Sequence, residues 1–208
     1  MIAIDILLEP DATLLERARR ANAILRGDHP AGFAFDETHL PHVTLVQRYV
    51  AVRDLEAVCA AVAQVPGGRD VVAMRLDVTG LQVRTDEPVG SASWRVAGTP
   101  ALRRLADACL AAVAPFAVAG GDAGAFVPND DGAPIRASTL AYVERFAPDH
   151  SGERYEPHVT LGRARAAFLR ELQDAPFEPF AFAPAALAIH QLGNHGTARR
   201  RLWRWPAT

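Results

Sequence analysis

Pro-His-Val-Thr-Leu occupies residues 41–45, and the same five residues recur at 157–161. The two histidines are therefore 158 − 42 = 116 positions apart in a chain of 208 residues. An identical pentapeptide at this separation indicates two copies of one structural unit. Each copy places β-branched residues after a proline, which predicts a short strand. The chain is thus expected to contain two related strands, one in each half.

The alternation of side chains along a strand decides what each repeat presents. Side chains two positions apart share one face of a strand. His42 and Thr44 are therefore expected on one face, with Val43 and Leu45 on the other. The second copy gives the same arrangement, with His158 and Thr160 together and the two aliphatic residues between and after them turned to the core. Each half then presents one imidazole and one hydroxyl side by side.

Strand and helix patterns alternate on both sides of the repeats. Strands are expected at about 2–8, 41–49, 70–84 (one or two strands, broken near Gly80), 91–96, 157–161, 180–192 and 200–205. Helices are expected at about 10–26, 52–65, 99–114 and 165–174, and a helix is favoured over a strand at 138–146. Residues 120–134 form a long Gly- and Asp-rich loop.

The element order predicts an α+β protein with two similar lobes. Both halves read strand, helix, His-x-Thr strand, helix, strand, and the boundary falls at Asp86-Glu87-Pro88-Val89-Gly90. We expect residues 1–208 to form a single bilobal domain, with lobes at about 1–87 and 88–208 and exchange of strands between them left open. A pseudo-two-fold axis would make antiparallel sheets face each other across a central cleft, with the helices outside.

Composition is that of an ordinary soluble protein. Half of the residues are hydrophobic and the formal net charge is −2. All 22 basic residues are arginine, but the 24 acidic residues leave no basic excess of the kind found in general nucleic-acid binders. The N-terminus lacks a signal-peptide pattern and no segment is long and apolar enough for a membrane span. Cys59 and Cys109 fall in helical patterns and are expected as small buried residues. These features favour the cytoplasm, and a monomer is expected.

Two facing histidines suit general acid–base catalysis. One imidazole takes a proton from a nucleophile while the other gives a proton to the leaving oxygen, and the threonine hydroxyls can donate to non-bridging phosphate oxygens. A single His-Val-Thr would more simply satisfy backbone groups at a strand end. Zinc is a second alternative, but it needs three or four ligands, and no Cys-x-x-Cys, His-x-His or His-Glu-x-x-His spacing supplies them. A Gly-x-Ser-x-Gly nucleophile motif is also absent. No metal or other cofactor is expected.

The two motifs resemble those of the two-histidine (2H) phosphoesterase superfamily, which includes the bacterial 2′-5′ RNA ligase-like and cyclic phosphodiesterase proteins. Pro41-His42-Val43-Thr44 and Pro157-His158-Val159-Thr160 both match in full, and a glycine such as Gly162 is typical after the second motif. Residues 141–146 and 151–155 resemble the approach to the second motif in some members. The resemblance implies a bilobal antiparallel fold and metal-independent attack on cyclic or 2′-5′ phosphodiesters.

Other side chains are weaker candidates. Arg48, Arg163 and Tyr155 are considered for the substrate rim, although Arg48 lies six residues from His42, and Arg163 has the opposite strand parity to His158. Tyr155 and Tyr49 suit either base stacking or core packing. The segment 199–205 mixes arginine with tryptophan and is expected as a terminal strand with tryptophans inward and arginines outward. His39, His190 and His195 are interpreted as structural or loop residues.

The sequence thus predicts a metal-independent phosphoesterase with His42 and His158 as catalytic residues and Thr44 and Thr160 as phosphate-binding residues. Its expected partner is an RNA end or small nucleotide carrying a 2′,3′-cyclic phosphate or a 2′-5′ phosphodiester. A nucleotide- or RNA-binding module without turnover is an alternative, and so is ligation with a 5′-hydroxyl in place of water. The sequence does not decide between hydrolysis and ligation, nor which histidine is the acid.

Overall fold

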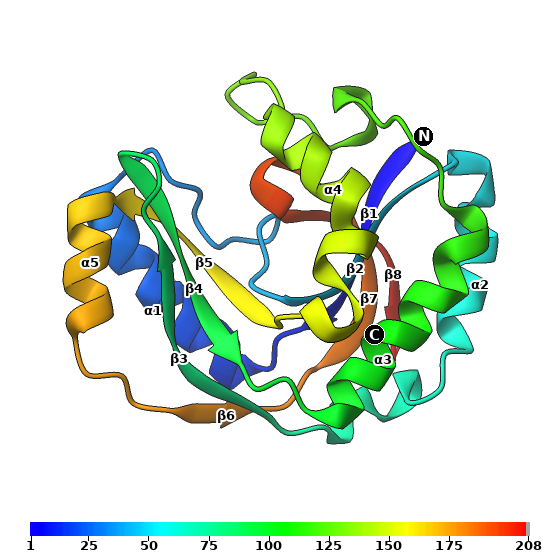
Figure 1. The fold of residues 1–208 in the computed structure, drawn as a ribbon, viewed down its shortest axis with the longest axis horizontal. Helices are drawn as coiled ribbons and strands as arrows, with labels where there is room; N and C mark the ends of the chain where they lie inside the picture. The colour runs from blue at the N-terminus through cyan, green and yellow to red at the C-terminus, as the bar shows by residue number, and fades with distance from the viewer. Residues whose placement is uncertain (207–208) are drawn as a thin grey trace.

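The structure is a computed structural model that describes residues 1–206 (Figure 1). Its strands are β1 (Ile2–Glu9), β2 (Val43–Val50), β3 (Leu76–Arg84), β4 (Val89–Val96), β5 (His158–Arg165), β6 (Phe180–Phe182), β7 (Ala186–Leu192) and β8 (Ala198–Trp205). The α-helices are α1 (Ala12–Asp28), α2 (Leu55–Ala63), α3 (Pro100–Val113), α4 (Ala137–His150) and α5 (Ala166–Asp174). Short 3₁₀ turns are η1 (Val52–Asp54), η2 (Gly68–Ala73), η3 (Ala114–Phe116), η4 (Ala123–Ala125), η5 (Gly152–Arg154) and η6 (Asn194–Gly196).

The strands form two four-stranded antiparallel sheets, which confirms the α+β prediction. The first sheet has the order β2-β1-β7-β8 and the second the order β5-β4-β3-β6. Each sheet carries one His-x-Thr motif on an edge strand, β2 in the first and β5 in the second. Figure 1 shows the two sheets on opposite sides of the molecule, with α4 crossing above the space between them.

Elements of the two chain halves are exchanged between the sheets. Strands β7 and β8 pair beside β1, and β3 lies in the second sheet beside β4. The helices are exchanged in the same way, because α1 packs on β5 whereas α3 packs on β2. Helix α5 covers β3 and β4, and α2 packs against α3 (Figure 1). The sheets therefore do not follow a single division of the chain near residue 87.

Most expected elements form, and the differences have local causes. Helix α1 begins at Ala12 because Asp11 caps it, its carboxylate accepting the amide of Leu14 at 2.8 Å. The segment expected as strand from residue 70 is 3₁₀ turn η2 as far as Ala73, and only β3 is extended. The ambiguous segment at 138–146 is helical, within α4. No helix among residues 1–206 has both the length and the apolar character that a bilayer span requires.

The C-terminal strand keeps the expected alternation around its tryptophans, but its outward face is partly covered. Trp203, Arg204 and Trp205 pair in unbroken order with Ile189, Ala188 and Leu187, and the register shifts between β7 and β8 lie before Trp203. Arg204, expected outward, lies mostly buried and donates to the buried carboxylate of Glu9 at 2.8 Å. Trp203 packs against the core as predicted, and the guanidinium of Arg69 lies over the ring of Trp205. His190 also pairs with Glu9, at 3.0 Å, so the structural role predicted for it is confirmed.

A β-bulge follows the motif in each edge strand and decides which later residues face the cleft. In β2 the pairing passes from Leu7–Thr44 to Ile6–Val46, which leaves Leu45 unpaired. In β5 it passes from Ser93–Thr160 to Ala92–Gly162, which leaves Leu161 unpaired. One unpaired residue reverses the parity of all later side chains. Gln47 and Arg163, each three positions after a motif threonine, are thereby turned to the same face as that threonine.

Gly162 is required at the second bulge. Its φ of +148° lies in a region that side-chain-bearing residues rarely adopt, and a Cβ there would lie 2.9 Å from Nδ2 of Asn22 on α1. That same Nδ2 donates to the carbonyl of Leu161 at 2.8 Å. The glycine therefore allows a buried side chain of α1 to hold the bulge in place.

Candidate active site

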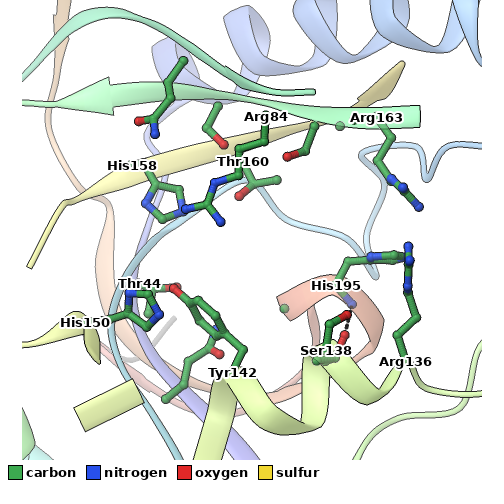
Figure 2. Close-up of a pocket in the computed structure, with 18 of the residues that line it drawn as sticks. Thr44, Arg84, Arg136, Ser138, Tyr142, His150, His158, Thr160, Arg163 and His195 are labelled. Atoms are coloured by element: carbon green, nitrogen blue, oxygen red, sulfur yellow. Dashed lines mark hydrogen bonds between the residues drawn. The ribbon is translucent and has the colours of Figure 1, made fainter. Parts of the chain in front are cut away.

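A cavity of about 380 Å³ lies between the sheets, and both motifs line it. His42, Thr44, His158 and Thr160 all contribute side chains to its wall. Figure 2 shows His158 and Thr160 on one side and Thr44 on the other, with the open space between them. The exchange of elements thus brings together two edge strands that are more than a hundred residues apart in the sequence.

The imidazole of His42 is fixed from both ends. Its Nδ1 lies 2.8 Å from the carbonyl oxygen of Leu40, which can only accept, so this nitrogen carries a hydrogen. Its Nε2 lies 3.5 Å from Oδ2 of Asp5, a residue of β1 whose side chain is completely buried. That separation is too long for a full hydrogen bond. Nε2 is therefore attracted by the carboxylate while its hydrogen stays available to a ligand.

The carboxylate of Asp5 lies next to both polar side chains of the first motif. Its Oδ2 accepts the hydroxyl of Thr44 at 2.8 Å and the side-chain amide of Gln47 at 2.9 Å. Gln47 is the residue that the β2 bulge turns to the cleft face, directly opposite Asp5 in the pairing with β1. One buried carboxylate therefore binds the hydroxyl of the motif and attracts its imidazole.

The electrostatic surroundings of His42 favour its protonated form. Burial acts to lower the pKa of the imidazole, but the attraction of the Asp5 carboxylate, helped by the Leu40 carbonyl, outweighs it. The pKa of His42 is therefore raised. This histidine holds its proton to higher pH than an ordinary imidazole.

The second motif has a similar backbone contact, but within residues 1–206 no carboxylate pairs with the His158 imidazole. Nδ1 of His158 donates to the carbonyl of Glu156 at 2.9 Å. The residues that face Thr160 and Arg163 from the neighbouring strand β4 are Ser93 and Ser91. Within residues 1–206 the Thr160 hydroxyl makes no hydrogen bond, so it can donate to a ligand.

The pKa of His158 is lowered. Burial is the largest cause, the Glu156 carbonyl opposes it, and the positive charges of Arg84, His42 and His150 lower the pKa further. Figure 2 shows the Arg84 guanidinium beside the His158 imidazole. The two motif histidines, which the repeat presents as equivalent, thus lie in opposite electrostatic environments. His158 is neutral near pH 7, with its Nδ1 holding the hydrogen and its Nε2 lone pair free.

The three weaker candidates have three different positions. Arg163 lines the cavity although its strand parity is opposite to that of His158, because the bulge at Leu161 reverses that parity. Arg48 is outside the cavity wall described by residues 1–206, because the bulge in β2 turns it to the opposite face. Tyr155 is 4% exposed and its hydroxyl donates to the carbonyl of Thr44 at 2.9 Å, so it connects the two motifs rather than forming a rim.

Several residues that line the cavity or support its walls were not identified from the sequence. Asp5 is hidden in an apolar strand, and Gln47 has the wrong parity until the bulge is known. Arg84, Arg136, Tyr142 and His150 lie outside both motifs, yet all line the cavity. His195, interpreted as a loop residue, also lines it. A polar residue inside an otherwise buried strand is the one sequence signal that could have identified Asp5.

The cavity shows no ready-made metal site. Among residues 1–206, no three His, Cys, Asp or Glu side chains come together in a way that could hold an ion. Cys59 and Cys109 are both free thiols, half-buried and buried respectively.

No protein-family model and no curated protein matches the sequence. Solved structures do match the fold over almost the whole chain. TT0787 of Thermus thermophilus aligns with a TM-score of 0.54 at 14% identity, covering 98% of this chain and 96% of its own. A structure described as a phosphoesterase has a TM-score of 0.50 at 14% identity (98% and 97% covered). E. coli LigT complexed with NADP⁺ has a TM-score of 0.50 at 13% identity (98% and 96% covered).

The fold of this chain is therefore one already known from solved structures. It is shared with the structure described as a phosphoesterase and with E. coli LigT. At 13–14% identity the likeness concerns the fold, and the chemistry has to be argued from the cavity itself.

Proposed function

We propose that the protein is a phosphoesterase that opens 2′,3′-cyclic phosphates, or cleaves 2′-5′ phosphodiesters, of nucleotides or RNA ends. The observation that carries the proposal is the pair of imidazoles that line one cavity with pKa values displaced in opposite directions. Titratable groups whose environments separate their pKa values are suited to be the acid and the base of one reaction. The shared fold of a phosphoesterase and of LigT bound to NADP⁺ adds support for a nucleotide phosphodiester.

In this proposal His158 is the general base and His42 the general acid. Nε2 of neutral His158 takes a proton from water, and the water oxygen forms a new bond to phosphorus. The bond from phosphorus to one ribose oxygen breaks, and Nε2 of protonated His42 gives its proton to that oxygen. The product is a ribose phosphate monoester. His158 then carries the proton and His42 has lost one, and exchange with solvent restores both.

The two threonines have different parts in the proposal. The Thr160 hydroxyl is free to donate to a non-bridging oxygen of the phosphate, where negative charge increases in the transition state. The Thr44 hydroxyl donates to Asp5 instead and presents only its lone pairs to the cavity. Thr44 therefore supports the carboxylate that keeps His42 protonated. Arg163 adds positive charge to the same wall.

The proposal is tested by turnover of nucleoside 2′,3′-cyclic phosphates and 2′-5′-linked dinucleotides. Wild type, His42→Ala, His158→Ala and the double variant are compared, each with and without a chelator. We expect each single variant to lose about as much activity as the double variant, because residues that act as a unit are non-additive. Chelation should not change the rate. Nucleotide binding without turnover by the wild type would mean a binding module, and activity that chelation removes and zinc restores would mean a metal site.

A further inference from the structure

A second group of cationic side chains lies in the same cavity, at a distance from the histidines. Arg163 on β5 and Arg136 at the start of α4 point toward each other, with His195 of η6 beside them (Figure 2). Arg163 lies three positions after Thr160 on the strand, a span of about 10 Å at most. A ligand whose reacting phosphate lies at Thr160 would thus reach these arginines with a neighbouring group.

The carboxylate of Glu87 occupies the space between the two arginines. Nη2 of Arg136 lies 3.2 and 3.3 Å from its two oxygens, and Nη2 of Arg163 lies 3.4 Å from Oε2. Arg163 also donates to the carbonyl of Val89 at 2.7 Å. Glu87 belongs to the turn between β3 and β4, and its side chain is 57% exposed. An anion therefore already lies in this position, supplied by a surface turn.

The ion pair leaves a net positive charge. Two guanidinium groups share one carboxylate, and within residues 1–206 neither has another acidic partner. The pKa of His195 is lowered to about 4, first by burial and then by the positive charges of Arg163 and Arg136. His195 therefore stays neutral at pH 7 and can donate a hydrogen bond to an anion.

The backbone at His195 is held in an uncommon conformation. Its φ and ψ of 59° and 22° lie in the left-handed region, which is rare for residues other than glycine. Its amide donates to Oγ1 of Thr139 at 3.1 Å, and that hydroxyl in turn donates to Oδ1 of Asn194, also at 3.1 Å. Backbone strain of this kind persists where surrounding contacts impose it, and it concentrates at functional sites. Here it directs an imidazole into the cavity.

We propose that Arg136, Arg163 and His195 form a subsite for a second phosphate of the substrate, which Glu87 occupies until substrate binds. The inference rests on the proposed function, because it assumes that another phosphate reacts at the histidines. The preferred substrate is then a nucleotide with a 5′-phosphate, or an RNA end, rather than a nucleoside 2′,3′-cyclic phosphate. Exposed ion pairs contribute little stability, so a more highly charged phosphate can displace Glu87. Paired arginines bind phosphate oxygens in a planar fork.

The test is calorimetric binding of two product-like ligands, a nucleoside 3′-phosphate and the matching 3′,5′-bisphosphate, repeated with the 2′ and 2′,5′ pair. We expect wild type to bind the bisphosphate at least tenfold more tightly. Arg136→Gln should reduce that preference to within twofold, and Glu87→Gln should increase it at least threefold. Asp86→Asn is the matched control, because this neighbouring carboxylate lines the cavity but pairs with neither arginine, and it should leave the preference unchanged.

A wild-type preference below twofold would overturn the subsite, as would failure of the bisphosphate to bind or a preference that Arg136→Gln leaves intact. Thermal unfolding of each variant establishes that it is folded, and Glu87→Gln supplies a gain that misfolding cannot mimic. Binding does not require turnover. Failure of the proposed function would appear as absent turnover with the phosphate preference intact. Failure of the subsite alone would appear as turnover of cyclic phosphates without any preference.

Discussion

Replacing Asp5 by asparagine should change the pKa of His42 while leaving that of His158 in place. The substitution keeps the size of a fully buried side chain and one acceptor oxygen for Thr44. It removes the negative charge 3.5 Å from Nε2 of His42. Burial, which lowers the pKa of His42, is then no longer outweighed. We therefore expect His42 to lose its proton at lower pH than in the wild type.

The size of the effect follows from Coulomb's law. Opposite charges 3.5 Å apart attract by about 5 kcal/mol at an effective dielectric constant of 20, which is an upper bound on what the pair contributes. Desolvation of both groups offsets much of this. We take ~1.4 kcal/mol, a factor of ten, as the smallest expected effect. The substitution also disturbs the hydrogen bonds from Thr44 and Gln47, at a cost of about 1–3 kcal/mol in unfolding free energy.

The assay is the pH dependence of kcat/KM for a 2′,3′-cyclic nucleotide. With His158 as base, the rate rises with pH through the lowered pKa of His158, and it falls through the raised pKa of His42. Asp5→Asn should move the alkaline limb to lower pH and leave the acidic limb in place. At a pH above the wild-type alkaline limb, kcat/KM should fall by at least tenfold relative to wild type.

Asp86→Asn is the control for Asp5→Asn, since it removes a cavity carboxylate that has no contact with His42. Its profile should match that of the wild type, and circular dichroism should show both variants folded at every pH used. An Asp5→Asn profile with the acidic limb displaced and the alkaline limb unchanged would refute the assignment of His42 as acid. If neither limb of the Asp5→Asn profile moved, Asp5 would not control the pKa of either histidine.

Other substitutions test the remaining parts of the account. Thr160→Val should reduce kcat by about 10²-fold while Thr160→Ser has a mild effect, because only the valine removes the free donor. Thr44→Val should instead lower the unfolding free energy by about 1–3 kcal/mol, measured by urea titration, because Asp5 loses a donor; a loss in kcat equal to that of Thr160→Val would contradict this distinction. Tyr155→Phe removes the bond to the Thr44 carbonyl and should cost about 1 kcal/mol of stability; unchanged stability would mean that the bond between the motifs contributes nothing.

The sequence predicted that the two motifs meet in one cavity because the repeated pentapeptide contains the residues concerned. His42, Thr44, His158 and Thr160 needed only strand alternation and a pseudo-symmetric fold to line one cavity. The exchange of elements between the sheets was not predictable, since β7 and β8 carry no local signal for pairing beside β1 rather than β3.

Which strand residues after each motif face the cavity depends on the two bulges. Each bulge depends on a single unpaired residue, Leu45 or Leu161, and reverses every side chain after it. Arg48 and Arg163 therefore exchanged the positions that unbroken alternation predicts. The opposite pKa shifts of the two histidines depend on Asp5. Its contact with the first motif can be recognised only once the pairing of β1 with β2 is known.

The roles of His42 as acid and His158 as base can be separated by comparing two phosphodiester substrates of one nucleoside, the 2′,3′-cyclic phosphate and a diester with a 4-nitrophenyl leaving group. A phenolate of this kind departs without a proton, so it does not need a general acid. We expect His42→Ala to lose most of its activity on the cyclic phosphate and to recover it on the aryl diester, while His158→Ala is impaired on both. Recovery by His158→Ala and not by His42→Ala would mean that His158 is the acid.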